Sequence, residues 1–444
     1  MRERPIGRET WKRPAFSAAS VAVPSAPAMA PPVAASGPPA MEPGLSRGDR
    51  FVAGCRPMPT ITLPGPDGRS APFTLSPPVA WPDTAAGPFP RVAFAAAHVV
   101  ADPRAAVDPW QGCALDWDAT IAVRRRLWRL GLGVAEAMDT AQRGAGLDWP
   151  TSLELIRRTL DAARDHPGAR VVSGCGTDDL ELAPRTTVAD VLAAYERQAE
   201  AIEAAGGRLV VMASRALAAI ARSPDQYGLV YDRLLAQVRE PVIVHWLGEA
   251  FDPALAGYWG ADGLDAAMDV AVDVINRNAA KVDGVKVSLL ERDREVAMRR
   301  RLAPGVRMYT GDDFDFADLI EGDAQGHSDA LLGIFDAIAP AASAALAALG
   351  AGDVDRYRAI LAPTVPLSRH VFSPPTRFYK TGIVFLAWLN GEQDAFAMVG
   401  GQQSARHALH LAELFRLADA AGLLRDPALA CARMRALMAV HGLG

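Results

Sequence analysis

The stretch 282–290, VDGVKVSLL, places a lysine inside a run of apolar residues that has the length of a buried β-strand. Valine and leucine pack well on strands, and a strand that is apolar on both faces is typical of a parallel sheet covered by helices. Similar apolar runs recur along the chain, with a weaker one near 324–328. Together with 282–289, the predicted strands are 92–98, 131–137, 169–175, 208–213, 241–246 and 306–310.

Longer amphipathic segments separate these strands and predict helices between them. Seven or eight apolar strands alternating with helices indicate an α/β protein, and at this length a (β/α)8 TIM barrel rather than an open sheet. No GxGxxG motif opens a helix after the first strand, which argues against a nucleotide-binding fold. The clearest of these helices are expected at 120–130, 150–165, 187–205, 225–238 and 264–278.

The segments that flank the predicted barrel differ from it in composition. Residues 1–57 are rich in proline and alanine and are expected to form a disordered extension. Residues 58–90 are expected to form a cap with a hairpin that turns at Asp67-Gly68. The barrel is expected over 91–335, and a helical region over 336–444. The clearest helices of that region are expected at 341–349, 353–361 and 403–423.

The overall composition excludes several classes of function. With 46 basic and 51 acidic residues the net charge is −5, which gives no electrostatic reason to bind nucleic acid or an anionic membrane. No apolar run approaches 18 residues, so no membrane-spanning segment is expected. The four cysteines lie far apart in the sequence, which favours a reduced, cytoplasmic compartment over a zinc-thiolate site.

Lys286, in the strand 282–289, is the residue that points most clearly to chemistry. Burying a charged lysine is costly, whereas a neutral buried amine is a good nucleophile. Lowering its pKa from about 10.4 to about 7 raises the neutral fraction at pH 7 to one half. The alternative is a structural lysine at the rim of the strand, paired with Asp283 or Asp312. The chain contains only four lysines: Lys12, Lys281, Lys286 and Lys380.

Other polar side chains lie where the predicted strands end. In a TIM barrel the carboxyl ends of the strands carry the active site, so these residues are expected to share one face of the barrel. They are His98, Glu136, Asp139-Thr140, 173–177, Ser214-Arg215, His245-Trp246, Ser288 and Asp312-Asp313.

The sequence resembles the dihydrodipicolinate synthase / N-acetylneuraminate lyase superfamily over roughly residues 90–425, as a divergent branch. The resemblance implies a class I aldolase on a (β/α)8 barrel with a C-terminal helical region, no cofactor, and assembly into dimers or tetramers. It also implies that Lys286, on the sixth strand, forms the Schiff base, and that 170–176 corresponds to the family's third strand with its Gly-rich end. Gly174 and Gly176 in this run are expected either to bind an anionic group of the substrate or to form a tight turn. The runs that carry the resemblance are RVVSGCG (170–176), PVIVHW (241–246), VKVS (285–288), YTGDD (309–313) and GHSDA (326–330).

Departures from the family pattern change the expected substrate. The family's Gly-Thr-Thr-Gly-Glu run, which holds the keto-acid carboxylate, corresponds to 138–142 (MDTAQ), where only Thr140 is kept. The family's Tyr-Asn pair on the fifth strand is replaced by His245 and Trp246. These changes argue against pyruvate plus aspartate semialdehyde and leave a 2-oxo acid or an aldehyde of unspecified identity.

The remaining site residues are assigned from this placement. His245 is expected to move protons beside the amine, unless it is a core histidine satisfied by the backbone. Thr140 is expected either to bind a carboxylate or to cap a helix. Ser288 and Asp312 are expected to contact substrate. Lys380 is too far along the chain to be favoured as the nucleophile.

Two rival hypotheses remain open at this point. One is a metal-dependent hydrolase or isomerase barrel, although the sequence has no His-x-His or HExxH spacing. The other is a barrel that binds a metabolite without catalysis. The metal ligands of the first hypothesis would be His98, Glu136, His245, Asp312 and His327.

Overall fold

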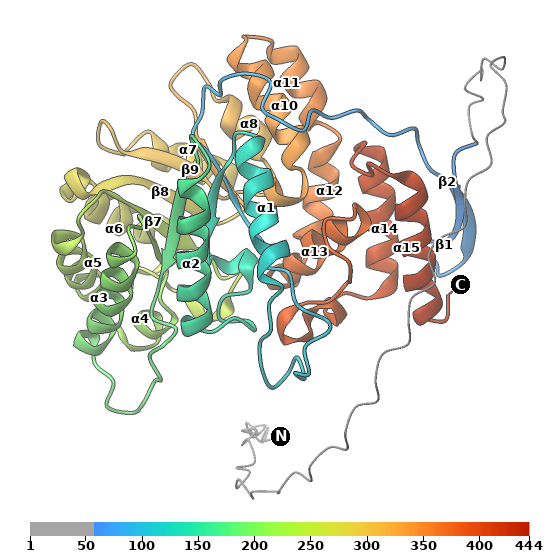
Figure 1. Cartoon of the computed structure of the whole chain (residues 1–444). Coiled ribbons are helices and arrows are strands. Elements are labelled where there is room, and N and C mark those ends of the chain that lie inside the picture. Colours follow the sequence, from blue (N-terminus) through green and yellow to red (C-terminus); the bar gives the residue numbers. More distant parts are fainter. Residues whose placement is uncertain (1–56, 444) are drawn as a thin grey trace, which may run out of the picture. The chain divides into compact units, whose positions relative to one another are not determined.

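Eight parallel strands close into a barrel in the computed structural model, which describes residues 57–443 (Figure 1). Each strand pairs with the strands before and after it in the chain, and the last strand, β10, closes the ring against the first, β3. The barrel strands are β3 (Ala93–Ala96), β4 (Gly133–Glu136), β5 (Val171–Cys175), β6 (Leu209–Met212), β7 (Val242–Leu247), β8 (Val282–Ser288), β9 (Arg307–Thr310) and β10 (Asp329–Leu332).

Helices connect consecutive strands and surround the barrel, because parallel neighbours can be joined only by a crossover. Asp148 and Thr187 cap two of these helices by accepting hydrogen bonds from backbone N–H groups of the first turn. The predicted (β/α)8 barrel is therefore confirmed. The connecting helices are α1 (Trp117–Arg129), α2 (Trp149–Arg164), α3 (Val188–Ala204), α4 (Arg215–Ile220), α5 (Pro224–Gln237), α6 (Gly263–Arg277), α7 (Arg292–Arg299) and α8 (Phe316–Glu321), with 3-10 turns η1 (Asp139–Ala141), η2 (Pro253–Leu255) and η3 (Ala279–Lys281).

The eighth strand is the one that the sequence placed wrongly. It occupies Asp329–Leu332, and the predicted segment 324–328 forms the turn before it. Gly326 in that turn has a φ of +148°, which non-glycine residues rarely adopt. The apolar run of β10 continues almost directly into α9 (Ile334–Ala337), so a strand and a helix merge into one apolar segment in the sequence.

Alternation along the strands separates an inner core from an outer one. On β7, Ile243 packs inside the barrel, whereas Val244 and Trp246 pack against the surrounding helices. Because side chains alternate along a strand, His245 points inward with Ile243. The inner core consists of Phe94, Ala96, Ala135, Met138, Val172, Val210, Ile243, Tyr309 and Leu331.

The C-terminal helical region packs against the barrel (Figure 1). Its central helix, α13 (Tyr379–Leu389), is buried along its whole length. The helices predicted at 341–349 and 353–361 are confirmed. The one predicted at 403–423 begins only at Ala408, because the His407 ring caps it by accepting a hydrogen bond from the His410 N–H. The other helices are α10 (Ala339–Gly350), α11 (Val354–Leu361), α12 (Thr364–Val371), α14 (Ala408–Ala420) and α15 (Pro427–Val440), with 3-10 turns η4 (Thr376–Phe378) and η5 (Val399–Ser404).

The predicted hairpin consists of β1 (Thr60–Pro64) and β2 (Ser70–Thr74), which pair antiparallel around the Asp67-Gly68 turn. It packs beside α14, where the Phe73 and Phe415 rings lie 6.3 Å apart. Hairpin, barrel and C-terminal helices contribute to one shared hydrophobic core. The predicted disordered extension lies outside the described residues, apart from residue 57. Within 57–443, no helix combines the length and hydropathy that crossing a membrane requires.

Candidate active site

Lys286 lies on the inner face of β8, near the carboxyl end of the barrel strands. In the sheet register its Cα is paired with His245 of β7 on one side and with Tyr309 of β9 on the other. Its side chain is almost fully buried, with 4% of the residue exposed. Burial lowers the pKa of Lys286 below its ordinary value, although Asp139 and Asp313 oppose this shift. The combination favours a neutral, nucleophilic amine.

Gly311, just after β9, makes room for the lysine side chain. A Cβ atom at this position would lie 2.8 Å from Cε of Lys286 and 2.2 Å from Oγ of Ser288. Any larger residue would therefore displace both side chains, and the glycine keeps the amine extended along the barrel interior.

His245 provides a neutral imidazole next to the lysine. Its Nε2 lies 3.2 Å from Oγ of Ser288, and 2% of the residue is exposed. Burial, together with the charge of Lys286, lowers the pKa of His245 well below its usual range, against an opposing effect of Asp139. A neutral imidazole can accept a proton and return it, which is the property that proton transfer requires. Ser288, which the sequence predicted to contact substrate, thus contacts His245.

Asp139, Thr140 and Tyr379 form a hydrogen-bonded group across the barrel mouth. The Tyr379 hydroxyl donates to Oδ2 of Asp139 at 2.7 Å and lies 2.6 Å from Oγ1 of Thr140. Because a phenol has one proton, Thr140 donates to the tyrosine oxygen. The Tyr379 ring stacks on Phe372 at a centroid distance of 4.3 Å, which fixes its orientation. Thr140 thus joins the site through Tyr379 of α13.

Asp139 is a buried carboxyl group surrounded by basic side chains. Burial alone would raise its pKa, but the proximity of Lys286, Lys380 and His245 and the hydrogen bond from Tyr379 lower it below the ordinary value. Its second oxygen, Oδ1, is buried without a hydrogen-bond donor among residues 57–443. A buried acceptor without a partner is costly, so this oxygen is available to a donor on a ligand.

Lys380 is a second buried amine at the site, although the sequence did not favour it as the nucleophile. Its Nζ donates to the carbonyl oxygen of Arg377 at 3.2 Å. Burial lowers the pKa of Lys380, and Asp139 opposes this shift more strongly than any other group. The amino end of α13 therefore brings both Tyr379 and Lys380 to the barrel mouth.

Asp313 faces Lys286 and is held in its protonated form. Its Oδ1 accepts a hydrogen bond from the backbone N–H of Ile334 at 2.9 Å. Burial raises the pKa of Asp313 to about 8, although this hydrogen bond and the charge of Lys286 act in the opposite direction. At neutral pH the carboxyl group is therefore mostly a neutral acid, able to donate a proton.

This protonated state makes the stability of the protein depend on pH. A group whose pKa rises on folding stabilises the fold fully below its unfolded pKa, and this stability is lost as pH rises through the folded pKa. The free energy of unfolding should therefore fall between pH 6 and 9, and about 2–3 kcal/mol of that fall should be absent in Asp313→Asn. Urea unfolding of the wild-type protein and of Asp313→Asn, each at pH 6 and at pH 9, measures these free energies. Glu295, whose pKa is also raised to about 8, titrates in both proteins, so its contribution cancels when the two falls in free energy are compared. An equal fall in both proteins would contradict the assignment.

A cavity of about 390 Å³ opens at the carboxyl ends of β4 to β7. Asp139 and His245 line it, together with Arg143 and Arg215 further out. Lys286 is not one of its lining residues and lies next to His245 in the sheet register. Arg143 is engaged by Asp178 at 2.7 Å, so its charge is already paired.

Gly174, Gly176 and Asp312 have structural contacts where the sequence predicted substrate contacts. A Cβ at Gly174 would lie 2.7 Å from the carbonyl oxygen of Ala137, so close packing explains the glycine. The Gly176 N–H donates to Gln198 at 2.7 Å and is not free for an anion. Asp312 caps the following turn, since its Oδ1 accepts from two backbone N–H groups, those of Phe314 and Asp315.

The five residues of the metal hypothesis do not come together. His98 pairs with Asp336 at 2.6 Å, and Glu136 points outward to Arg124 at 2.8 Å. His327 precedes β10 and lies at the opposite, amino end of the strands. Among residues 57–443, no group of three or more His, Cys, Asp or Glu side chains is placed to hold a metal ion.

Solved structures that resemble this chain include members of the dihydrodipicolinate synthase family. One is YagE of E. coli K12, a prophage protein of the dihydrodipicolinic acid synthase family in complex with pyruvate, which is 14% identical with a TM-score of 0.55 over 80% of this chain and 99% of that chain. The chloride-inhibited dihydrodipicolinate synthase from Acinetobacter baumannii complexed with pyruvate is 14% identical, with a TM-score of 0.55 over 75% and 99%. The enzyme from Bacillus clausii is 15% identical, with a TM-score of 0.54 over 73% and 96%.

At these identities the similarity establishes a common fold. The resemblance predicted from the sequence is therefore confirmed for the fold. Fold and site together define a (β/α)8 barrel with a buried lysine on its sixth strand. A comparison with curated protein sequences finds no match. The chain belongs to the family described as "Protein of unknown function (DUF993)", whose model matches residues 61–443.

Proposed function

We propose that the protein is a class I lyase, in which Lys286 forms a Schiff base with a small carbonyl substrate. The observation that carries this proposal is the buried, inward-facing amine of Lys286, with a depressed pKa, beside the neutral imidazole of His245. Burial shifts such an amine toward its neutral form, which is the form that attacks a carbonyl carbon.

The reaction requires protons to be moved at defined steps. The amine nitrogen bonds to the carbonyl carbon, the oxygen is protonated and leaves as water, and an iminium ion remains on Lys286. The iminium accepts the electron pair of a breaking C–C or C–H bond, which permits aldol cleavage, condensation or dehydration. His245 accepts and returns the proton at the carbon centre, and the hydroxyl of Tyr379, linked to Asp139, protonates the departing oxygen.

The charges around Lys286 favour a neutral carbonyl substrate over a 2-oxo acid. Asp139 is an ionised carboxylate, and its unpartnered Oδ1 would repel the carboxylate of a 2-oxo acid. A hydroxyl group on the substrate would instead donate to this oxygen and satisfy it. A hydroxylated aldehyde or ketone therefore suits the site better than pyruvate, the compound bound in the E. coli and A. baumannii structures.

Reductive trapping with cyanoborohydride tests both parts of the proposal. Dihydroxyacetone and pyruvate are both ketones, and they differ in whether hydroxyl groups or a carboxylate flank the carbonyl. We expect adduct formation to be about tenfold faster with dihydroxyacetone, and Asp139→Asn to reduce this preference. Faster trapping of pyruvate would overturn the substrate class and leave the Schiff base intact. No adduct above the level of a Lys286→Met control, with any carbonyl compound, would overturn the function itself.

A further inference from the structure

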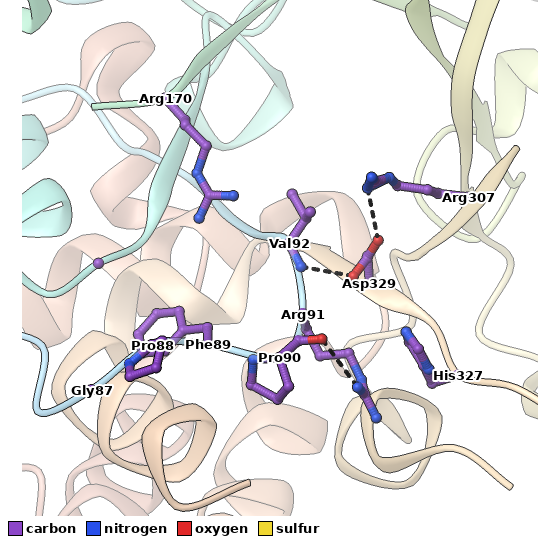
Figure 2. A pocket seen from close by; sticks show the side chains of 11 residues that line it. Gly87, Pro88, Phe89, Pro90, Arg91, Val92, Arg170, Arg307, His327 and Asp329 are labelled. Carbon is purple, nitrogen blue, oxygen red and sulfur yellow. Dashed lines mark hydrogen bonds and ion pairs between the residues drawn. The ribbon is translucent and has the colours of Figure 1, made fainter. Parts of the chain in front are cut away.

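A second cavity, of about 570 Å³, lies at the amino end of the barrel, opposite Lys286. Its wall is formed by the segment 87–92 and by residues at the starts of β5, β9 and β10 (Figure 2). We name it the amino-end cavity; its charged lining residues are Arg91, Arg170, Arg307, His327 and Asp329. No part of the proposed Schiff-base reaction uses it.

Strand geometry brings these arginines together although they are far apart in sequence. Arg170 directly precedes β5, and Arg307 is the first residue of β9. The neighbouring strand β4 begins with Gly133, where a Cβ would lie 3.3 Å from Cβ of Arg170 and within 2.6 Å of the Phe94 ring. The missing side chain therefore leaves room for the Phe94 ring beside Arg170.

Two of the three arginines have hydrogen-bonding capacity to spare. Arg91 is fixed, because its guanidinium donates to the backbone oxygens of Ile320 at 2.8 Å and Glu321 at 3.0 Å. Among residues 57–443, the guanidinium of Arg307 makes a single polar contact, an ion pair of 3.7 Å with Asp329. The guanidinium of Arg170 makes no hydrogen bond or ion pair with any residue in 57–443, and it lies 6.0 Å from the Phe94 ring centre.

Positive charge is in excess in the amino-end cavity. Three guanidinium groups face one carboxylate, Asp329, which is itself engaged by the Val92 N–H at 2.7 Å. Burial and the charges of Arg91 and Arg299 lower the pKa of His327, so the imidazole is neutral and adds no charge. A smaller cavity that shares Arg170 and Arg307 continues into the barrel. An anion would relieve the repulsion among these guanidinium groups.

We propose that the amino-end cavity binds a small molecule that carries a phosphate group. Figure 2 shows Arg170 and Arg307 extending into the cavity from different strands. The planar guanidinium matches phosphate oxygens in a bidentate way, and a phosphate has enough acceptors for both arginines, whereas a carboxylate has fewer. The volume exceeds that of free phosphate and falls within the usual range for ligand sites. The rings of Pro88, Phe89 and Pro90 offer an apolar wall for the rest of the molecule.

Calorimetric titration of the full chain with inorganic phosphate tests the proposal. We expect saturable binding that weakens as sodium chloride is added, and a loss of about tenfold or more in affinity for Arg170→Gln and for Arg307→Gln. The matched control is Arg157→Gln, an exposed arginine on α2 that makes no ion pair with the described residues, and it should change affinity less than about twofold. Lys286→Met should bind phosphate normally, which keeps this test separate from the proposed reaction.

Three results would overturn the proposal. One is the absence of saturable phosphate binding to the wild-type chain. Another is an unchanged affinity in the Arg170→Gln, Arg307→Gln double variant, provided that its thermal unfolding shows a folded protein. Malonate binding as tightly as phosphate would overturn the choice of phosphate as the ligand group.

Discussion

Lys286→Met should reduce the rate of carbonyl adduct formation by at least about 10³-fold, because it removes the only atom that the proposed mechanism bonds to substrate. Methionine fills a similar volume in the space that Gly311 leaves, so the variant should remain folded. The measurement is the rate at which the chain gains the mass of the reduced adduct with dihydroxyacetone and cyanoborohydride. Lys286→Arg should be equally inactive, since a guanidinium keeps the charge and lacks a nucleophilic amine.

The other lysines of the described chain serve as controls. Lys281 lies just before β8 and donates to the carbonyl oxygen of Val238 at 2.7 Å, so Lys281→Arg should retain the wild-type rate. Lys380→Met removes the second buried amine and should slow the reaction without abolishing the adduct. An adduct that persists in Lys286→Met and disappears in Lys380→Met would show that Lys380 is the nucleophile and would contradict the proposal.

Tyr379→Phe should slow adduct formation by about 10²-fold or more, the range typical of losing a group that transfers a proton in the transition state. The change removes the hydroxyl that donates to Asp139 and accepts from Thr140, while the ring can still stack on Phe372. The dependence of the adduct rate on pH should also change shape, because a proton donor is lost.

Tyr357→Phe is the matched control for that variant. Tyr357 is also buried, and its hydroxyl donates to the carbonyl oxygen of Ala317 at 2.7 Å, away from Lys286. Its loss should lower the free energy of unfolding by about 1 kcal/mol and leave the adduct rate unchanged. Equal rates for wild type and Tyr379→Phe would show that the tyrosine has only a structural role.

The barrel could be predicted from the sequence because its strands are short, apolar and separated by amphipathic helices. Lys286 and His245 were selected as candidates in the same way, because a polar side chain inside such an apolar strand is unusual. The eighth strand was misplaced because its apolar residues continue directly into those of α9. The hydrophobic pattern therefore does not show where the strand ends and the helix begins.

The sequence analysis assigned Asp312 to substrate contact, and the alternation of side chains along a strand adds its neighbour Asp313 as a candidate. Tyr309 points into the barrel, and Gly311 lies against Lys286, so the residue two further on continues that face. The alternation of residues 309, 311 and 313 is visible in the sequence and places Asp313 on the inner face of the barrel. Asp312 falls on the other side, where it caps backbone N–H groups.

Tyr379 and Lys380 could not be placed from the sequence. They lie on a helix far along the chain, and the local sequence does not indicate which part of the barrel this helix packs against. The one available signal was a lysine at the start of the apolar segment 379–389, in a chain that has four lysines. Tertiary packing alone brings them beside Asp139.

Peptide mapping of the wild-type chain after reductive trapping tests the central claim most directly. A reduced adduct on Lys286 blocks trypsin there, so the peptide 282–292 should appear intact and heavier by the mass of the reduced substrate, while cleavage after Lys281 continues. An unmodified Lys286, with the added mass on another lysine or nowhere in the chain, would contradict the claim that this buried amine is the nucleophile.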